Sequence, residues 1–286
     1  MKIDTLILSG GGPSAVAYFG IFQSLFEKNI IHENLDGINE IITTSAGIFI
    51  SVCLLIRFKI ELCKEIVMNY DLAKLLDHDN LTIDDFLDDF GFFSTDKIGL
   101  FVQNIIKHKL KKNDLTLKEL YEYNATKLTV KVFNATKKQL EYISHESDPD
   151  LSILKLVQMT TAIPGFFKPV KYNDYLYVDG GLRGHFPIEV CQSENYLGLF
   201  IRGGTVTKNE VLEMFPILEF IYSLMIHQDQ TVYDIKNNKI NKRIIYCQID
   251  YGLNFDMKTE DKIKLIEKGY EVTKNHINLH LEKDKV

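Results

Sequence analysis

Cysteine is scarce in this sequence, with four residues among 286. Cys53, Cys63, Cys191 and Cys247 are scattered along the chain and form no CxxC motif or other metal-ligand spacing. Isolated cysteines of this kind are typical of buried, reduced thiols in a cytosolic protein rather than of disulfides or zinc sites. We therefore expect neither a disulfide framework nor a bound metal ion or other cofactor.

Long hydrophobic runs are missing as well. The most apolar stretch, residues 48–56, is well short of the roughly 20 residues that a bilayer-spanning helix needs, and Arg57 ends it. The apolar run at residues 3–8 leads directly into a glycine loop, which indicates a first strand rather than a signal peptide. We expect a cytoplasmic protein that meets membranes at most peripherally and transiently.

Positive charge is not in excess. The chain has 33 Lys and Arg against 39 Asp and Glu, which gives a formal net charge of -6. This balance gives no electrostatic support to nucleic-acid binding, so we expect no nucleic-acid partner. It also argues against charge-driven adhesion to anionic membranes, and any contact with lipid should be mainly apolar.

Repeats, low-complexity tracts and Pro/Gly/Ser-rich linkers are absent, which favours a single domain. What the sequence contains instead is an alternation of short apolar runs with helical patterns. Residues 3–8 and 38–42 predict strands, whereas residues 17–28 and the stretch from Ser45 to about Arg57 predict helices. Because this is the order of βαβ units, we predict a three-layer α/β/α fold with a mostly parallel central sheet.

The later segments continue this pattern. Further strands are predicted at 128–134 and 139–144 (as a hairpin), 175–178, 196–201 and 243–249, and further helices from the cap Asp150 to about Thr161, over 209–234 and over 259–281. Residues 163–169 predict a loop. We assign residues 1–205 to the main domain, with a helical insertion over about 60–120, and residues 206–286 to a strand and helices that complete it.

A serine lies in a tight turn between an apolar strand and an apolar helix, at Thr43-Thr44-Ser45-Ala46-Gly47. This is the context of a nucleophile elbow, which holds a serine on a sharp, strained turn with its Oγ exposed. The second glycine of the G-x-S-x-G pattern is present as Gly47, but Thr43 takes the place of the first. The segment alone fits an ordinary serine N-cap equally well.

A glycine loop, Gly10-Gly11-Gly12, follows the first strand and opens a helix. Glycines let backbone N–H groups approach a ligand oxygen closely. One interpretation is a dinucleotide phosphate loop, with Glu33 or Asp36 as its acidic residue. The other is an oxyanion loop beside the serine turn, which we favour because both loops would lie at the carboxyl ends of parallel strands.

The third motif is Asp179-Gly180-Gly181, which also ends a predicted strand. A carboxylate in the same crevice as Ser45 could take the serine proton directly as a general base. An ordinary Asp-Gly turn is the commoner role of such a dipeptide.

In this order, the three motifs resemble the patatin-like phospholipase family. The resemblance extends over about residues 3–200 and includes the landmarks Phe133-Asn-Ala-Thr136, Ser147-Asp-Pro-Asp-Leu-Ser152, Thr161-Ala-Ile-Pro-Gly-Phe-Phe167, Tyr177-Val-Asp-Gly-Gly181 and Pro187. It implies a metal-free lipid acyl hydrolase, a phospholipase A-type enzyme or general acyl esterase. Ser45 would be the nucleophile and Asp179 the base, with backbone N–H groups of Gly10, Gly11, Gly12 and Ala46 as the oxyanion hole.

The sequence departs from the family pattern at four positions. Ser14 and Ala15 stand where the family usually has a basic residue and a glycine, Thr43 replaces the first elbow glycine, and His185 replaces an asparagine. We expect these changes to slow the enzyme rather than to abolish its activity. The departures also keep open a catalytically weak or inactive relative that binds a lipid or a partner. A histidine-dependent esterase is a third reading, with candidate bases His185, His227, His276 and His280.

The insertion carries two clusters of uncertain purpose. An aromatic patch, either plain core or a lid that meets lipid, consists of Phe86, Phe90, Phe92, Phe93 and Phe101. An acidic cluster consists of Asp77, Asp79, Asp84, Asp85, Asp88 and Asp89. Leu81 falls where an EF-hand would need an oxygen ligand, so we expect a solvated helix face there instead of a calcium site.

Overall fold

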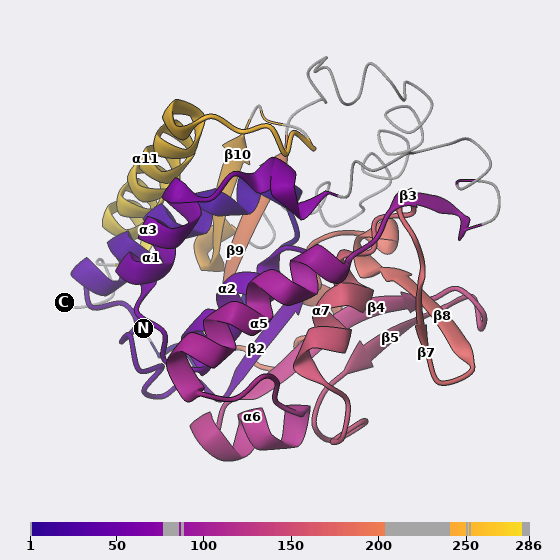
Figure 1. The fold of residues 1–286 in the computed structure, drawn as a ribbon. Helices are drawn as coiled ribbons and strands as arrows, with labels where there is room; N and C mark the ends of the chain where they lie inside the picture. Colours follow the sequence, from indigo (N-terminus) through magenta and orange to yellow (C-terminus); the bar gives the residue numbers. More distant parts are fainter. Residues whose placement is uncertain are drawn as a thin grey trace.

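The computed structural model describes residues 2–76, 86, 89–203, 241–249, 251 and 253–281. It shows a central sheet flanked by helices (Figure 1). The helix predicted over 209–234 lies outside the described residues. Within them, no helix is both long and apolar enough to cross a membrane.

The central sheet has eight strands among the described residues, in the order β10-β9-β1-β2-β4-β8-β7, with β5 paired to β4. They are β1 (Thr5–Leu8), β2 (Glu40–Thr44), β4 (Lys127–Asn134), β5 (Gln139–Ile143), β7 (Val170–Tyr172), β8 (Tyr175–Asp179), β9 (Tyr196–Gly203) and β10 (Ile244–Ile249). The strands from β10 to β4 are parallel to their neighbours. Strands β5, β7 and β8 are antiparallel to theirs. The predicted α/β fold with a mostly parallel central sheet is confirmed.

The helices lie between these strands in the sequence or follow the last of them. They are α1 (Tyr18–Glu27), α2 (Gly47–Leu55), α3 (Ile60–Asn69), α5 (Asp96–Leu110), α6 (Leu117–Asn124), α7 (Ile153–Thr161) and α11 (Thr259–His276), with the 3₁₀ helices η1 (Gly12–Ala17), η2 (Leu72–Leu75), η3 (Gly180–Arg183) and η4 (Ile188–Val190). In Figure 1, α5 and α7 cross in front of β2 and β4, and α11 lies beside α1 and α3.

Both faces of the parallel strands are buried, which explains their unbroken apolar sequences. Side chains alternate between the two faces of a strand. Leu6 and Leu8 belong to the large core beneath the helices. Ile7 lies on the other face of the sheet, in a smaller cluster with Phe186 and Phe200. A short run such as residues 3–8 is therefore recognisable from the sequence without any alternation of polarity.

The crossing of α1 and α11 depends on two glycines. A methyl group on Gly20 would overlap the carbonyl oxygen of Ile266 and lie 2.7 Å from the amide nitrogen of Tyr270. A methyl group on Gly269 would likewise overlap the carbonyl oxygen of Ala17. The backbones of the two helices are thus close enough that only glycine fits at these positions.

Two local predictions were wrong. The loop predicted over residues 163–169 contains a short strand, β6 (Gly165–Phe167), which pairs in parallel with β3 (Gly91–Phe93) in a second sheet. The cap of α7 is Ser152, whose side chain accepts a hydrogen bond from the Lys155 N–H, and not Asp150. The strand pairing joins segments about 70 residues apart, so a local reading of proline and glycine could not detect it.

The cysteines agree only in part with the expectation of buried, isolated thiols. All four are free, and Cys191 is half-buried while the other three are buried. Cys53 in α2 and Cys63 in α3 are in contact, with their Sγ atoms 3.4 Å apart. Their pairing arises because the loop between the two helices is short.

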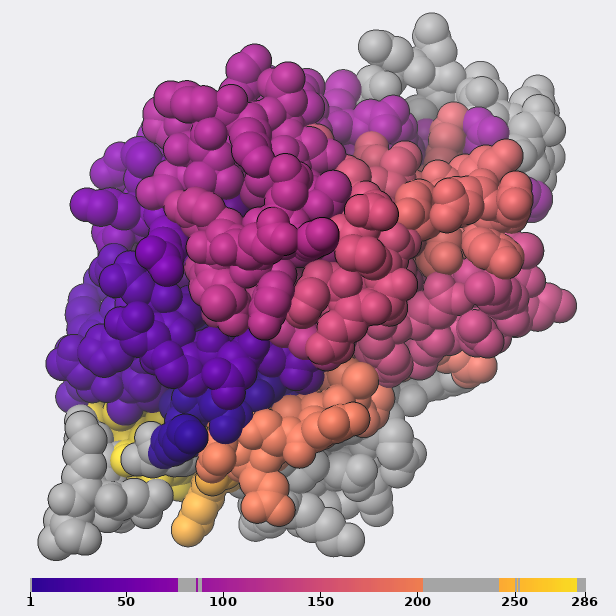
Figure 2. Space-filling view, turned by 90° about the horizontal axis from the view of Figure 1, so that it is seen from below, coloured from indigo at the N-terminus to yellow at the C-terminus, as the bar shows by residue number. Residues whose placement is uncertain are grey.

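At the amino ends of β1 and β9, hydrogen bonds join segments that are far apart in the sequence. In Figure 2 the indigo residues at the N-terminus border the orange residues that lead into β9. There the Asp4 N–H donates to the Asn195 carbonyl oxygen at 2.9 Å, and Ser193 Oγ donates to Asp4 Oδ1 at 2.5 Å. These contacts fix β1 beside β9, and the carboxyl ends of both strands point to the other edge of the sheet.

Candidate active site

Ser45 lies in the turn between β2 and α2, with a left-handed backbone conformation (φ 51°) that a residue with a Cβ rarely adopts. Its N–H donates to Thr160 Oγ1 at 2.8 Å, and Thr160 Oγ1 in turn donates to the Lys131 carbonyl oxygen at 2.9 Å. A methyl group on Gly47 would lie 2.6 Å from the Ser9 carbonyl oxygen. The strained turn is therefore held from both sides, by α7 and by the end of β1.

Thr43, one of the departures from the family pattern, lies in β2 two residues before Ser45 and is fully buried. Its Oγ1 has no hydrogen-bond partner and is directed at Gly47, where a methyl group would collide with it. The threonine thus fits because the residue opposite it is glycine. Its side chain packs against the start of α2.

Asp179 ends β8 and is 3% exposed. Its Oδ1 accepts a hydrogen bond from the Gly181 N–H at 2.7 Å, and its N–H donates to the Ala162 carbonyl oxygen at 2.9 Å. The Ser45 side chain lies close enough to the carboxylate to favour its charged form. The structure therefore brings Ser45 and Asp179 together.

Asp179 ends a strand, as the sequence predicts, but this strand is not one of the parallel strands of the sheet. Strand β8 runs antiparallel to β4. Strand β4 extends beyond the end of β2, because Thr44 pairs with Lys131 while β4 continues to Asn134. Strand β8 pairs with this extension and runs back, so that Asp179 stands opposite Val132, next to the level of the serine turn.

Burial dominates the electrostatics of Asp179. Desolvation raises the pKa of its carboxyl group to about 6, although the nearby Ser45 side chain, the Gly181 N–H and the positive charge of Lys131 each act to lower it. A carboxyl group with this pKa is mostly ionised at neutral pH and still accepts a proton more readily than an exposed aspartate does.

The glycine loop lies directly against the serine. A methyl group on Gly10 would be 2.8 Å from Ser45 Cβ, so only glycine allows this approach. The Gly10 N–H donates to the His185 carbonyl oxygen at 2.8 Å and is thereby engaged, contrary to the expectation that it would contribute to an oxyanion hole. The N–H groups of Gly12 and Ala46 stand at the starts of η1 and α2, where a helix offers no internal acceptor.

The position of the loop also argues against a dinucleotide site. Such a site needs its acidic residue beyond the second strand, in the crevice at the carboxyl ends of the strands. Glu33 and Asp36 precede β2 and therefore lie at the amino end of the sheet. Both side chains are exposed there.

Ser14 and the segment after β10 pack against each other and against the glycine loop. Ser14 is buried, and its Oγ donates to the Tyr251 carbonyl oxygen at 3.0 Å. Leu253 covers Gly12, whose φ is 51° and where a methyl group would lie 2.8 Å from Leu253 Cδ2. The position that is usually basic in the family is thus occupied here by a small hydroxyl that contacts another part of the chain.

A buried hydroxyl network, absent from the sequence analysis, fixes the end of β1. Ser9 Oγ accepts from the Ile201 N–H at 2.9 Å, and the Tyr18 hydroxyl donates to the Ser9 carbonyl oxygen at 2.8 Å. Burial raises the pKa of Tyr18 far above its usual range, which keeps it a neutral donor. Tyr18 looked like an ordinary member of an apolar helix face, so no local signal identified it.

An apolar pocket opens beside Ser45, which is one of its lining residues. Its walls come from η1, α1, α2, α3, η2, α5 and α7, and they are almost entirely hydrocarbon. Phe49 of α2 stacks on Phe101 of α5 with ring centroids 5.4 Å apart, and Phe255 lines the wall opposite α5 together with Phe167. The pocket has the chemistry of an acyl-chain site.

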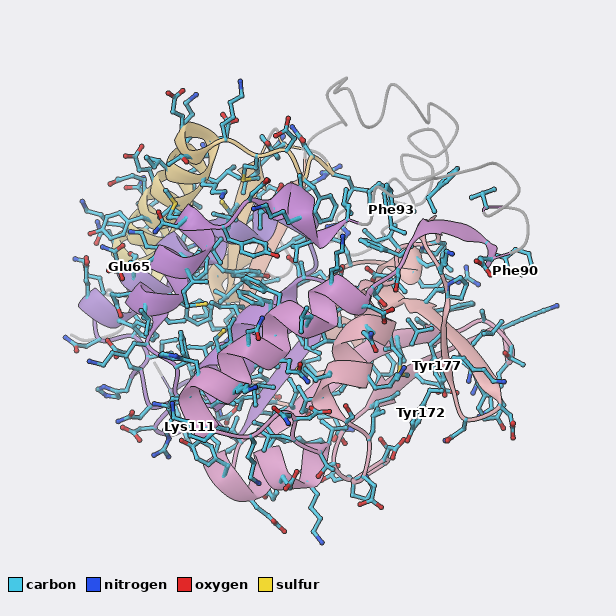
Figure 3. The ribbon with its side chains drawn as sticks, in the orientation of Figure 1. Glu65, Phe90, Phe93, Lys111, Tyr172 and Tyr177 are labelled. Atoms are coloured by element: carbon cyan, nitrogen blue, oxygen red, sulfur yellow. The ribbon has the colours of Figure 1, made fainter. Side chains whose placement is uncertain are left out.

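The aromatic patch of the insertion divides into core and surface. Phe92 and Phe93 are buried, Phe86 stacks on Phe92, and Phe101 lines the pocket. Phe90 is 65% exposed and points away from the domain, whereas Phe93 lies closer to its centre (Figure 3). A lid formed by this insertion stays a prediction.

The acidic cluster lies largely outside the described residues. Asp89 is described, and it forms an ion pair with Lys168 Nζ at 2.6 Å. Among the described ranges, no group of three or more His, Cys, Asp or Glu side chains is arranged to hold a metal ion.

The histidines that could serve as a catalytic base differ in their distance from Ser45 and Asp179. His276 Nε2 lies 3.3 Å from the Lys242 carbonyl oxygen, just before β10 begins, and His280 contacts the His276 ring. Both are therefore at the amino end of the sheet, far from Ser45. His185 is nearer, and its ring lies 5.1 Å from that of Phe200. His227 lies outside the described residues.

Comparison with known proteins agrees with these motifs. A family model for patatin-like phospholipase matches residues 6–191. The probable lipid hydrolase 463L of Invertebrate iridescent virus 6 is 30% identical over 187 residues, which cover 65% of this chain and 62% of that protein. The match thus spans less than two thirds of the viral relative.

Two solved structures share the fold. VipD from Legionella pneumophila has a TM-score of 0.66 at 18% identity, and the match covers 98% of this chain and 67% of that one. Full-length ExoU from the type III secretion system of Pseudomonas aeruginosa, in complex with SpcU, has a TM-score of 0.52 at 16% identity. There the match covers 98% of this chain and 53% of that one.

Proposed function

Because the chain belongs to the patatin-like phospholipase family, we propose that it is a lipid acyl hydrolase with Ser45 as nucleophile and Asp179 as general base. The observation that carries this proposal is that Ser45, in a strained turn, lies beside the buried carboxylate of Asp179 and also lines an apolar pocket. The substrates are acyl esters of lipids, of phospholipase A or general acyl esterase type. The enzyme works in the cytoplasm and meets membrane surfaces transiently.

The first half-reaction forms an acyl-enzyme. Ser45 Oγ attacks the ester carbonyl carbon while its proton passes to the Asp179 carboxylate. The N–H groups of Gly11, Gly12 and Ala46 stabilise the negative charge that develops on the carbonyl oxygen. The C–O bond to the alcohol then breaks, and the alcohol leaves with the proton from Asp179.

The second half-reaction regenerates the enzyme. A water molecule gives a proton to Asp179 and attacks the acyl carbon, and Ser45 Oγ leaves with that proton as the fatty acid is released. The positive φ of Ser45 supports this role, because the left-handed turn directs the side chain out of the strand and toward the glycine loop.

The pocket supports an acyl chain as the group that is bound. Burial of hydrocarbon contributes about 0.8 kcal/mol per methylene, so a long chain gains most of its affinity there. The near absence of charge in the lining leaves the head group to be bound outside it.

A direct test measures fatty acid release from a phosphatidylcholine and from a simple acyl ester. Ser45→Ala and Asp179→Asn should each lower kcat by at least about 10³-fold, as losses of a nucleophile or its base do. Retained hydrolysis in either variant would rule out the dyad. His185→Ala and His276→Ala test the histidine-dependent alternative and should leave measurable turnover.

A second candidate function is favoured by Ser14, Ala15 and Thr43. A catalytically weak or inactive relative would bind a lipid or a partner in the same pocket. Such a protein would bind fatty acid without releasing product from any ester, and Ser45→Ala would leave its affinity unchanged.

A further inference from the structure

A buried lysine, Lys131 of β4, lies next to the Ser45–Asp179 pair. Its side chain is 1% exposed. Lysine is almost never buried to this degree unless its charge is compensated. Its neighbour in β4, Val132, pairs with Asp179 across the sheet. Lys131 thus belongs to the strand that pairs with β8, the strand that carries the base.

The Lys131 ammonium group binds the loop that follows Asp179. Its Nζ donates to the carbonyl oxygens of Arg183 at 2.9 Å and Gly184 at 2.7 Å, and to Glu189 Oε1 at 2.5 Å. The first two acceptors end η3, which begins directly after Asp179. All three donor positions of the ammonium group are therefore used on residues 183–189.

The backbone carbonyl group of Lys131 is connected to the turn that carries Ser45. Its carbonyl oxygen accepts hydrogen bonds from Thr160 Oγ1 at 2.9 Å and from Thr44 Oγ1 at 3.2 Å. Thr160 accepts the Ser45 N–H, and Thr44 immediately precedes Ser45. One residue thus connects the serine turn with the loop behind the base.

We propose that Lys131 is a positioning residue for hydrolysis, which holds the Asp179 loop in register with the Ser45 turn. This inference rests on the proposed function. Lys131 does not touch the substrate. It acts through Asp179, whose carboxylate its positive charge favours.

Charged and titratable groups on the surrounding elements set the strength of this effect. Glu189 of η4 is paired with Lys131, and the Tyr142 hydroxyl of β5 donates to Glu189 Oε1 at 2.6 Å. Arg183 contributes its carbonyl oxygen, and the Cβ of His185 lies near Gly181. Because Glu189 is negative, it offsets part of the field that Lys131 exerts on Asp179.

The test is the pH dependence of kcat/KM for fatty acid release by the full chain, between about pH 5 and 9. Removing the positive charge in Lys131→Met should move the acidic midpoint upward, because loss of a nearby opposite charge favours the protonated carboxyl group. Lys131→Arg keeps the charge and should keep the wild-type midpoint, with a lower kcat where the hydrogen bonds fit poorly. Glu189→Gln should move the midpoint downward.

Lys131→Met and Glu189→Gln are expected to shift the pH midpoint in opposite directions, and this contrast tests the proposal. An unchanged midpoint in both Lys131→Met and Glu189→Gln would overturn the proposal, even if kcat fell. If Lys131→Met does not fold, the direction of the Glu189→Gln shift decides alone. A wild-type protein that releases no fatty acid at any pH contradicts the proposed function instead, so the two failures are distinct.

Discussion

The two residues of the proposed dyad, Ser45 and Asp179, both occupy positions that cost folding free energy. Ser45 has a left-handed backbone, which costs about 1–2 kcal/mol for a residue with a Cβ. Asp179 is a buried carboxylate whose pKa is raised to about 6. Strain and desolvation at the same place are typical of sites at which stability has been given up for reactivity.

The raised pKa makes a prediction about stability. The unfolded carboxyl has a pKa of about 3.9, so between about pH 4 and 6 the native state binds more protons than the unfolded state. The contribution of Asp179 to stability is therefore greatest below about pH 4 and is lost as the pH rises through about 6. Asp179→Asn should raise the free energy of unfolding at pH 7 by up to about 3 kcal/mol, the equivalent of two pKa units.

Denaturant unfolding at pH 7 and at pH 5 measures this effect. The gain from Asp179→Asn should be smaller at pH 5, where the wild-type carboxyl is already largely protonated. Asp148→Asn, which removes the charge of another, half-buried carboxylate, is the matched control. A variant at Asp179 that is less stable than the wild type at both pH values would contradict the desolvation account.

At the scale of elements, Gly20 and Gly269 allow the backbones of α1 and α11 to pack in direct contact. Gly20→Ala should destabilise the protein by about 1–3 kcal/mol or more, because the new methyl group overlaps the backbone of α11. Glu267→Ala, at an exposed position of α11, is the matched control and should change stability by less than about 0.5 kcal/mol. Thermal unfolding compares the two, and equal stabilities would mean that the helices separate easily.

The sequence predicts the individual elements better than it predicts how distant strands pair. Apolar runs such as β1 and β2 and the motifs around Ser45 and Asp179 are local patterns, and each was predicted at its place. The antiparallel direction of β8 was not, because it depends on how far β4 extends beyond β2. The pairing of β3 with β6 depends in the same way on contacts between distant segments.

Supporting residues were missed for a similar reason. Lys131 and Thr160 stand in segments with ordinary strand and helix patterns, and nothing next to them in sequence marks them as polar partners. Their importance arises from burial and from partners about 29 to 115 residues away. Gly10 was predicted as part of the loop, but the engagement of its N–H by His185 depends on the fold of residues 180–185.

At the scale of the whole molecule, the pocket is assembled from both ends of the chain. η1 and α2 provide one side, α5 and α7 another, and Phe255 from beyond β10 closes it. The segment that carries Tyr251 and Leu253 also covers the glycine loop. The part of the chain beyond the family match at residues 6–191 thus contributes to the site.

The pocket predicts a preference for acyl-chain length that depends on α5. Val102 lines the pocket, whereas Leu100 of the same helix is 54% exposed. Val102→Trp should fill part of the cavity and lower kcat/KM for long-chain esters about 10-fold or more, while short-chain esters are retained. Leu100→Trp is the control and should leave the profile unchanged. Loss of long and short substrates alike would mean that the acyl chain binds elsewhere.

The central claim is that Ser45, activated by Asp179, forms a covalent intermediate. The most direct measurement is the mass of the peptide that contains Ser45 after treatment of the folded protein with a fluorophosphonate. The account predicts a stoichiometric adduct on Ser45 in the wild type, a much slower adduct in Asp179→Asn, and none in Ser45→Ala. Folded wild-type protein that remains unmodified at Ser45, or that is modified equally fast without Asp179, would contradict it.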